Sequence, residues 1–152
     1  MRNIAMIAVL RPLVLAFALF AAPAFAQGVN APDGVAAAGT DVVAYFRAGK
    51  PVAGTPGHTV EWNGAVWRFS SEANRAAFAA DPERYAPRYG GFCAWAVAQG
   101  YRAGIDPLAW RIVDGRLYLN YSRAIRARWD MSRTANIAKA DANWPRLAGE
   151  RP

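Results

Sequence analysis

The chain has 152 residues, with 18 Lys and Arg against 11 Asp and Glu, and a formal net charge of +7 at pH 7. This length fits one domain, and an apolar content of 54% is enough for a packed core. A single cysteine excludes an intramolecular disulfide. The positive charge is spread along the chain without a recognisable nucleic-acid module, so we expect no nucleic-acid partner.

The first 26 residues have the pattern of a secretory signal peptide. Arg2 and Arg11 supply a basic region, residues 13–22 form an unbroken apolar run, and Ala-Phe-Ala at 24–26 fits a cleavage site. An uncleaved anchor is the alternative, but the run is short beside the about 20 residues of a bilayer crossing. We therefore expect a periplasmic or secreted protein without stable membrane insertion, in which removing 26 of the 152 residues leaves 126.

The segment after the cleavage site predicts little regular structure. Residues 27–39 are small, contain Gly and Pro and lack periodicity, which indicates a flexible leader. Residues 41–46, DVVAYF, are typical of a short strand or a helical turn, and residues 51–57 form a loop.

The next segment, residues 60–85, predicts a hairpin that leads into a helix. Strand-type residues flank Asn63-Gly64, a dipeptide that tolerates the positive φ angles of a type I′ turn. Ser70 or Ser71 can cap the helix. The helix is expected to end at Asp81-Pro82, because a residue before proline is displaced from the α region.

A second unit of the same kind follows a helix predicted at 92–99. Asp114-Gly115 gives another type I′ signal between strands at 110–113 and 116–121. Ser122 is the expected cap of the next helix, and a last helix is predicted at 134–143. Residues 146–152 are expected to be a disordered tail.

The two hairpin–helix units can be aligned on their turns. Placing Gly64 on Gly115 matches Ser71 with Ser122, and it matches Phe78 with Trp129. The match fits either an old duplication or a common local pattern of hairpin, cap and helix. Because such turns and caps recur by chance, the sequence alone favours the common pattern.

Several segments together resemble the exported YHS domain family. The core string has an aromatic-x-Phe-x-Ser element before a helix, followed by Phe-x-x-Asp-Pro-x-x-Tyr at 78–85. Similar stretches cover nearly the whole mature chain: TDVVAYFRAG at 40–49, YAPRYGGFCAWAVAQ at 85–99, WRIVDGRLYLNYS at 110–122 and IAKADANWP at 137–145. The eponymous triplet is imperfect, since Trp67 and Arg68 stand at the tyrosine and histidine places.

From these patterns we predict one small α+β domain at residues 40–145. It should hold two antiparallel β-hairpins, each followed by a helix, and about four short helices in total. The resemblance also implies a departure in metal chemistry. Related treble-clef versions carry two cysteines where this chain has Ser70 and Asn74, so the usual thiolate site is absent.

Cys93 and His58 are the weak candidates for catalysis or metal binding. A helix start near Cys93 would lower the pKa of its thiol and favour a nucleophile or redox group. The apolar neighbours of Cys93 instead favour burial as a packing residue. His58 would be the partner of a Cys–His pair, or would join Cys93 and Met131 in copper binding, although a solvated loop histidine is the more common case.

Polar-tipped aromatic rings suggest a binding site more strongly than any catalytic set does. Such rings line clefts as readily as cores, and the candidate ligand-binding residues are Tyr89, Cys93, Trp95, Tyr101, Trp110 and Tyr118. Arg123, Arg126 and Arg133 fall near one helical face, which fits either an anion site or a solvated face with Asp130 pairing Arg126.

The leading hypothesis is therefore an exported, non-catalytic binding or accessory module of YHS type for an unidentified small molecule or protein. A thiol-dependent redox factor or enzyme using Cys93 is one alternative, and a carrier of copper or another soft metal is the other. No cofactor is predicted beyond that copper possibility, and the sequence does not determine the oligomeric state.

Overall fold

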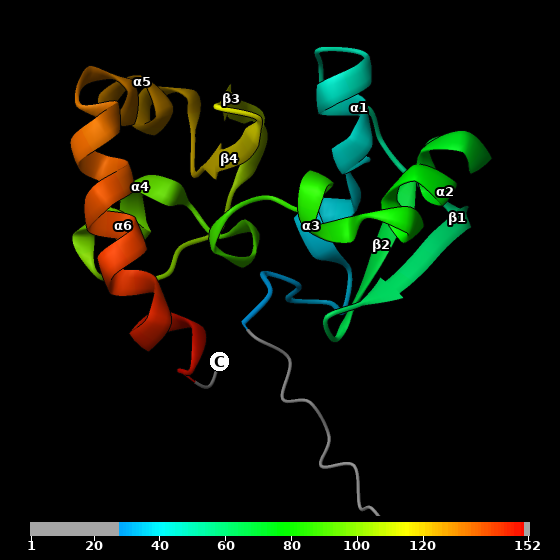
Figure 1. Ribbon diagram of the computed structural model, residues 1–152, viewed down its shortest axis with the longest axis horizontal. Coiled ribbons are helices and arrows are strands. Elements are labelled where there is room, and N and C mark those ends of the chain that lie inside the picture. Colours follow the sequence, from blue (N-terminus) through cyan, green and yellow to red (C-terminus); the bar gives the residue numbers. More distant parts are fainter. Residues whose placement is uncertain (1–27, 151–152) are drawn as a thin grey trace, which may run out of the picture.

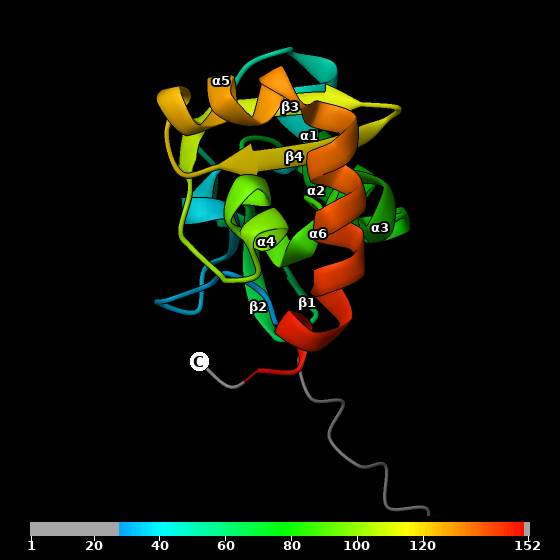
Figure 2. The same cartoon turned by 90° about the vertical axis from the view of Figure 1, so that its left-hand side faces the viewer.

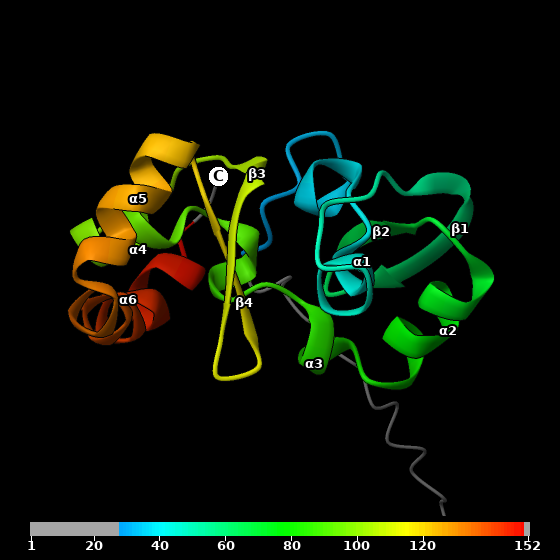
Figure 3. The same ribbon diagram turned by 90° about the horizontal axis from the view of Figure 1, so that it is seen from above.

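The computed structural model describes residues 28–150, so the signal-peptide prediction lies outside the described residues. The molecule consists of two halves that lie side by side, with the second hairpin between the helices of the two halves (Figures 1 and 3). Each half contains one two-stranded antiparallel sheet. The predicted α+β class, with two hairpins each followed by a helix, is confirmed.

The first half runs from the 3₁₀ turn η1 to the short helix α3. Its elements are η1 (Ala36–Gly39), α1 (Val42–Arg47), β1 (Thr55–Trp62), β2 (Ala65–Phe69), α2 (Glu72–Ala80) and α3 (Pro82–Tyr85). The second half then begins with another 3₁₀ turn and ends with the longest helix. Its elements are η2 (Tyr89–Gly91), α4 (Ala94–Gln99), β3 (Asp106–Val113), β4 (Arg116–Asn120), α5 (Arg123–Met131) and α6 (Arg133–Ala148).

The two halves have the same order of elements, and four pairs of elements match in length, whereas α3 has 4 residues and its counterpart α6 has 16. Helices α1 and α4 each have 6 residues, and α2 and α5 each have 9. The first strand of each hairpin has 8 residues and the second has 5. Both hairpins also break register near the start of their first strand. The correspondence therefore extends well beyond the turn and the cap that the sequence shows.

The hairpin turns have the predicted backbone. Asn63 and Gly64 have φ angles of 51° and 77°, and Asp114 and Gly115 have φ angles of 49° and 72°. Two successive positive φ angles define the type I′ turn, which Asn-Gly and Asp-Gly adopt at low cost. Both turn predictions are confirmed.

The helices that follow the hairpins begin at the predicted serines. The Ser71 hydroxyl accepts a hydrogen bond from the Asn74 amide at 3.1 Å, and the Ser122 hydroxyl accepts one from Ile125 at 3.1 Å. Each bond satisfies one of the amide groups left free at a helix start.

Two hydrophobic cores share the second hairpin. The first core contains Trp67, Phe69 and Phe78, together with Leu117 and Leu119 of β4. The second core lies among α4, α5 and α6 and receives the neighbouring β4 residue Tyr118. Successive side chains of a strand point to opposite faces. The β4 strand therefore contributes side chains to both cores and joins the two halves. Figure 2 shows α4 beside α6 on the side away from the first half.

The predicted flexible leader is wrong for the described residues 28–39. The Gly28 amide donates to Ala148, the Asn30 amide donates to Gly90, and Ala36 and Ala37 are buried. Gly90 has a φ angle of 61°, and a Cβ there would lie 2.0 Å from the Gly28 carbonyl oxygen, so this close approach requires glycine. Small residues that suggested flexibility instead allow close packing.

The predicted disordered tail at 146–152 is also wrong in its first part. Helix α6 continues through Pro145 to Ala148, and the Leu147 side chain is fully buried in the second core. Burial of Leu147 stabilises this last turn, although proline removes one hydrogen bond from the helix. The described residues contain six α-helices where about four were expected, because residues 42–47 form the helix α1 and residues 82–85 form the helix α3.

Candidate functional site

Cys93 lies directly before α4 and is the N-cap residue of that helix. Its thiol is buried, and the residue is only 1% exposed. The sulfur accepts a hydrogen bond from the Tyr121 amide at 3.3 Å, and the thiol donates toward the Asn120 side-chain oxygen at 3.7 Å. The same oxygen accepts from the Trp95 amide at 3.1 Å, which fixes the orientation of the Asn120 amide. The thiol is thus held between α4 and the end of β4.

Burial raises the pKa of the Cys93 thiol, although backbone amides of Ala96, Tyr121 and Trp95 oppose this rise. The expectation that the helix start would lower this pKa is therefore not met. Removing the thiol from water disfavours its charged form more than the nearby amides favour it. Cys93 is a neutral thiol at neutral pH, which is the state of a packing residue or of a weak donor to a ligand.

Cys93 nevertheless borders a hollow of about 200 Å³ at the surface of the second half. The walls carry three polar-tipped rings, those of Trp95, Tyr101 and Tyr121, and the apolar side chain of Ile125. Tyr101 is 49% exposed, so its ring forms an edge of the opening. We call this hollow the thiol pocket, and its full lining is Cys93, Trp95, Ala96, Tyr101, Ala103, Tyr121 and Ile125.

The structure brings three of the six predicted ligand-binding residues together in the thiol pocket, namely Cys93, Trp95 and Tyr101. The other three lie elsewhere. Tyr89 and Tyr118 pack together in the second core with ring centroids 5.9 Å apart. Trp110 packs on Tyr45 at 5.2 Å and so joins the two halves.

Sequence reasoning missed Tyr121 and Ile125 as pocket residues. Tyr121 follows β4 directly and Ile125 lies in the first turn of α5, where the capping pattern drew attention to Ser122 alone. The position of Tyr121 was a signal that could have been used, because a large ring directly before the capping Ser122 lies where the alternating strand pattern ends.

The structure does not bring His58 to Cys93. His58 lies on β1 in the first half, and its Nδ1 atom is 3.5 Å from the Glu72 carboxylate. Met131, the suggested soft donor, is 84% exposed at the end of α5. Across residues 28–150 there is no group of three or more His, Cys, Asp or Glu side chains that could hold a metal ion.

Ser70 and Asn74 enclose a buried carboxylate, that of Asp41. One oxygen of Asp41 accepts from the Ser70 amide at 2.9 Å, from the Ser70 hydroxyl at 2.6 Å and from the Asn74 side chain at 2.8 Å. Its other oxygen accepts from the amides of Val43 and Ala44 at 3.0 and 3.2 Å. Five donors thus compensate a fully buried carboxylate.

Asp41 and Cys93 occupy equivalent places in the two halves. Each is the N-cap residue of a 6-residue helix. The Asp41 amide donates to Val52 at 2.8 Å, and the Cys93 amide donates to Ala103 at 3.0 Å. Each side chain also accepts from the first amide after the hairpin, that of Ser70 or that of Tyr121. In the first half, the side chains of Ser70 and Asn74 close over Asp41. The thiol pocket lies at the equivalent place in the second half and is open.

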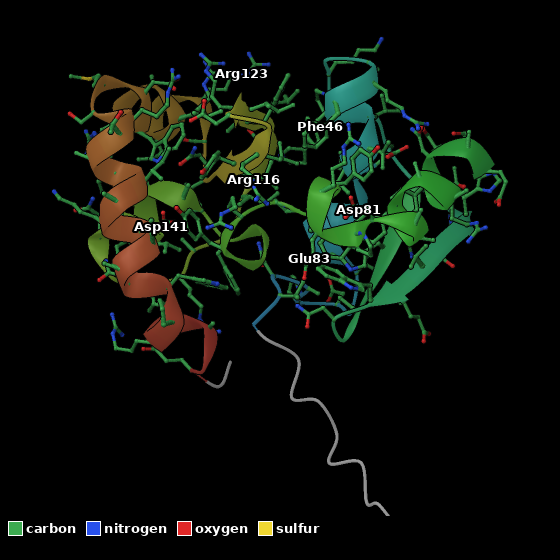
Figure 4. All side chains as sticks on the ribbon, viewed as in Figure 1. Phe46, Asp81, Glu83, Arg116, Arg123 and Asp141 are labelled. Carbon is green, nitrogen blue, oxygen red and sulfur yellow. The ribbon has the colours of Figure 1, made fainter. Side chains whose placement is uncertain are left out.

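A second hollow, of about 290 Å³, lies between the halves. Glu83 of α3 and Arg116 of β4 both line it, and Figure 4 shows both near the centre of the molecule. Trp62, Tyr89 and Trp144 supply ring surface. This hollow includes Tyr89 but none of the other predicted ligand-binding residues.

A scan against protein-family models and searches of the curated proteins and of the solved structures found no match to this chain. Separately, none of the helices within residues 28–150 is both long enough and apolar enough to cross a bilayer.

Proposed function

We propose that this protein is an exported, non-catalytic binding module of YHS type that holds a small planar, largely apolar molecule in the thiol pocket. The observation that supports this proposal is the pocket itself, in which three polar-tipped rings surround a neutral thiol. Aromatic walls of this kind favour a flat ligand, because ring–ring contacts add to the free energy of apolar burial. The thiol and the tyrosine hydroxyls would then orient a polar edge of the ligand.

Non-catalytic binding is favoured over thiol chemistry by the surroundings of Cys93. A thiol nucleophile requires a nearby base or a lowered pKa. His58 lies in the other half of the molecule, and the pKa of Cys93 is raised by its burial. The amide and carbonyl groups around the sulfur hold the thiol in place without taking its proton.

The proposal is tested by titrating the purified protein with indole and with 4-methylphenol while amide and indole N–H signals are followed by NMR. We expect saturable shifts confined to Trp95, Tyr101, Tyr121 and their neighbours. Tyr101→Ala should weaken binding by about two- to tenfold, because a lost ring–ring contact is worth about 0.5–1.5 kcal/mol. Tyr101 is half exposed, so this variant should fold normally.

Leu108→Ala is the matched control, since Leu108 is 46% exposed and lies outside the thiol pocket. It should leave binding unchanged. Shifts scattered over the surface, or equal affinities of the Tyr101→Ala and control variants, would contradict the proposal. Enzymatic turnover that is lost in Cys93→Ala would favour the thiol enzyme instead.

A further inference from the structure

A second feature of the second half is a group of three arginines around one carboxylate. Arg111 of β3 and Arg133 of α6 each place a guanidinium nitrogen 3.1 Å from an Asp130 oxygen, and Arg126 of α5 lies 3.7 Å from it. These residues come from three different elements, so the packing of the fold sets their positions. We call Arg111, Arg126, Arg133 and Asp130 the arginine cluster.

The arginine cluster has a net positive charge that Asp130 does not fully compensate. Three guanidinium groups share a single carboxylate, which leaves an excess of two positive charges. Like charges held this close repel one another unless an anion lies among them. Asp130 is only 18% exposed and neutralises the cluster from its inner side, whereas two of the arginines are about 40% exposed.

The arginines also retain hydrogen-bonding capacity. A guanidinium group has five N–H donors in a fixed planar arrangement, whereas a carboxylate offers about four acceptor sites in all. The Nε atoms of Arg126 and Arg133 are shielded from solvent and have no hydrogen-bond partner, as is also true of one Asp130 oxygen. The contacts with Asp130 therefore hold the side chains in place and leave donors unused.

Arg123 adds a further positive charge at the start of α5, near this group. It lies three residues before Arg126 and seven before Asp130, a spacing that places all three on one side of the helix. The first turn of α5 contains no acidic residue, and a cation there opposes the helix dipole. Figure 4 shows Arg123 at the outer edge of the second half.

The first half shows that the shared scaffold does not require these arginines. Where α5 begins with Arg123, α2 begins with Glu72, the charge that the helix dipole favours. Arg75 takes the place of Arg126, and Glu72 engages it through three hydrogen bonds of 2.6–3.0 Å. The positions equivalent to Asp130 and Arg133 are Ala79 and Pro82. The cluster is thus particular to the second half.

We propose that the arginine cluster, with Arg123 at its edge, binds a phosphate or sulfate group. A tetrahedral oxyanion with two charges would balance the excess positive charge and accept hydrogen bonds from the exposed guanidinium ends of Arg111 and Arg133. Guanidinium groups suit this role because their planar forks donate two parallel hydrogen bonds to such oxyanions. The oxyanion is either a free ion or the headgroup of an anionic lipid, and the chemistry of recognition is the same.

The test is a titration of the full protein with inorganic phosphate and with sulfate, followed through the Nε–H signals of Arg126 and Arg133 by NMR. We expect saturable shifts of these two signals. The double variant Arg111→Gln with Arg133→Gln should weaken phosphate binding at least tenfold. A control that removes two exposed charges elsewhere, Arg84→Gln with Lys139→Gln, should weaken it less than twofold.

Arg123→Glu separates binding from folding. Reversing this charge suits the helix dipole, so the thermal midpoint should stay the same or rise while phosphate affinity falls at least threefold. Equal weakening by the double variant and its control would overturn the proposal, because binding would then follow net charge alone. Absence of saturable shifts with both ions and with the vesicles described below would overturn it as well.

Vesicles distinguish the sources of the oxyanion. In one outcome the protein co-sediments with phosphatidylglycerol vesicles but not with phosphatidylcholine vesicles, and this binding is lost in the double variant and kept in the control. That result would support the proposal and identify a lipid headgroup as the source. Saturable binding of inorganic phosphate without vesicle binding would support it and identify a free ion. The thiol-pocket titration is independent of these measurements, so either proposal can fail alone.

Discussion

The two halves of the molecule follow the same path and differ in what occupies equivalent places. In the first half the residue before the 6-residue helix is Asp41, and Ser70 and Asn74 close over it with hydrogen bonds. In the second half that residue is Cys93, and Tyr121 and Ile125 stand beside an open pocket. A retained scaffold can thus be structural in one half and available for a ligand in the other.

A duplication explains this correspondence better than a shared local pattern does. Turns and caps recur in unrelated proteins, but two details here have no such general cause. Three successive residues of positive φ precede the capping position in both halves, at 37–39 and at 89–91. Both hairpins break register between the first and fifth residues of an 8-residue strand. These details concern the backbone, and the sequence comparison could not reveal them.

The largest expected difference between the halves is in stability. Asp41→Ala should lower the free energy of unfolding by about 3 kcal/mol or more, because it leaves the Ser70 and Asn74 donors buried without an acceptor. Cys93→Ala should cost about 1 kcal/mol, since only the apolar burial of the sulfur and its weak hydrogen bonds with Tyr121 and Asn120 are lost. Urea denaturation measures both values. Similar losses for the two variants would show that the hydrogen bonds of Asp41 contribute little.

The chemical behaviour of Cys93 provides a second contrast. Its raised pKa predicts slow alkylation by iodoacetamide in the native state below about pH 8.5, the pKa of a free cysteine, and faster alkylation in urea. A raised folded-state pKa adds stability below the unfolded pKa, and this stability is lost as pH rises through the folded value. Native labelling as fast as in urea at pH 7 would instead indicate an activated thiol.

The sequence predicted local structure well because turns and caps depend on a few adjacent residues. Asn63-Gly64 and Ser71 are examples, and their roles are confirmed. It failed at 28–39 and 146–148, where contacts between distant segments decide the structure, as in the bond between Gly28 and Ala148. For the same reason it grouped Tyr89 and Trp95 in one binding site, whereas in the fold they line different hollows.

The smallest effect, and the most direct test of equivalence, concerns the two helix caps. Ser71→Ala and Ser122→Ala each remove one hydrogen bond of 3.1 Å to the third residue of the helix. Each should lower the free energy of unfolding by about 1 kcal/mol, and the two losses should agree within about 0.5 kcal/mol.

Ser132→Ala is the matched control, because Ser132 precedes α6 without a side-chain capping bond and should cost less than about 0.5 kcal/mol. Unequal losses for the two capped helices, despite similar cap geometry, would show that the two caps are not energetically equivalent. The β4 strand argues that the halves unfold as one unit, because its alternating side chains enter both cores. Loss of either cap should therefore shift a single unfolding transition, observed equally by far-UV circular dichroism and tryptophan fluorescence.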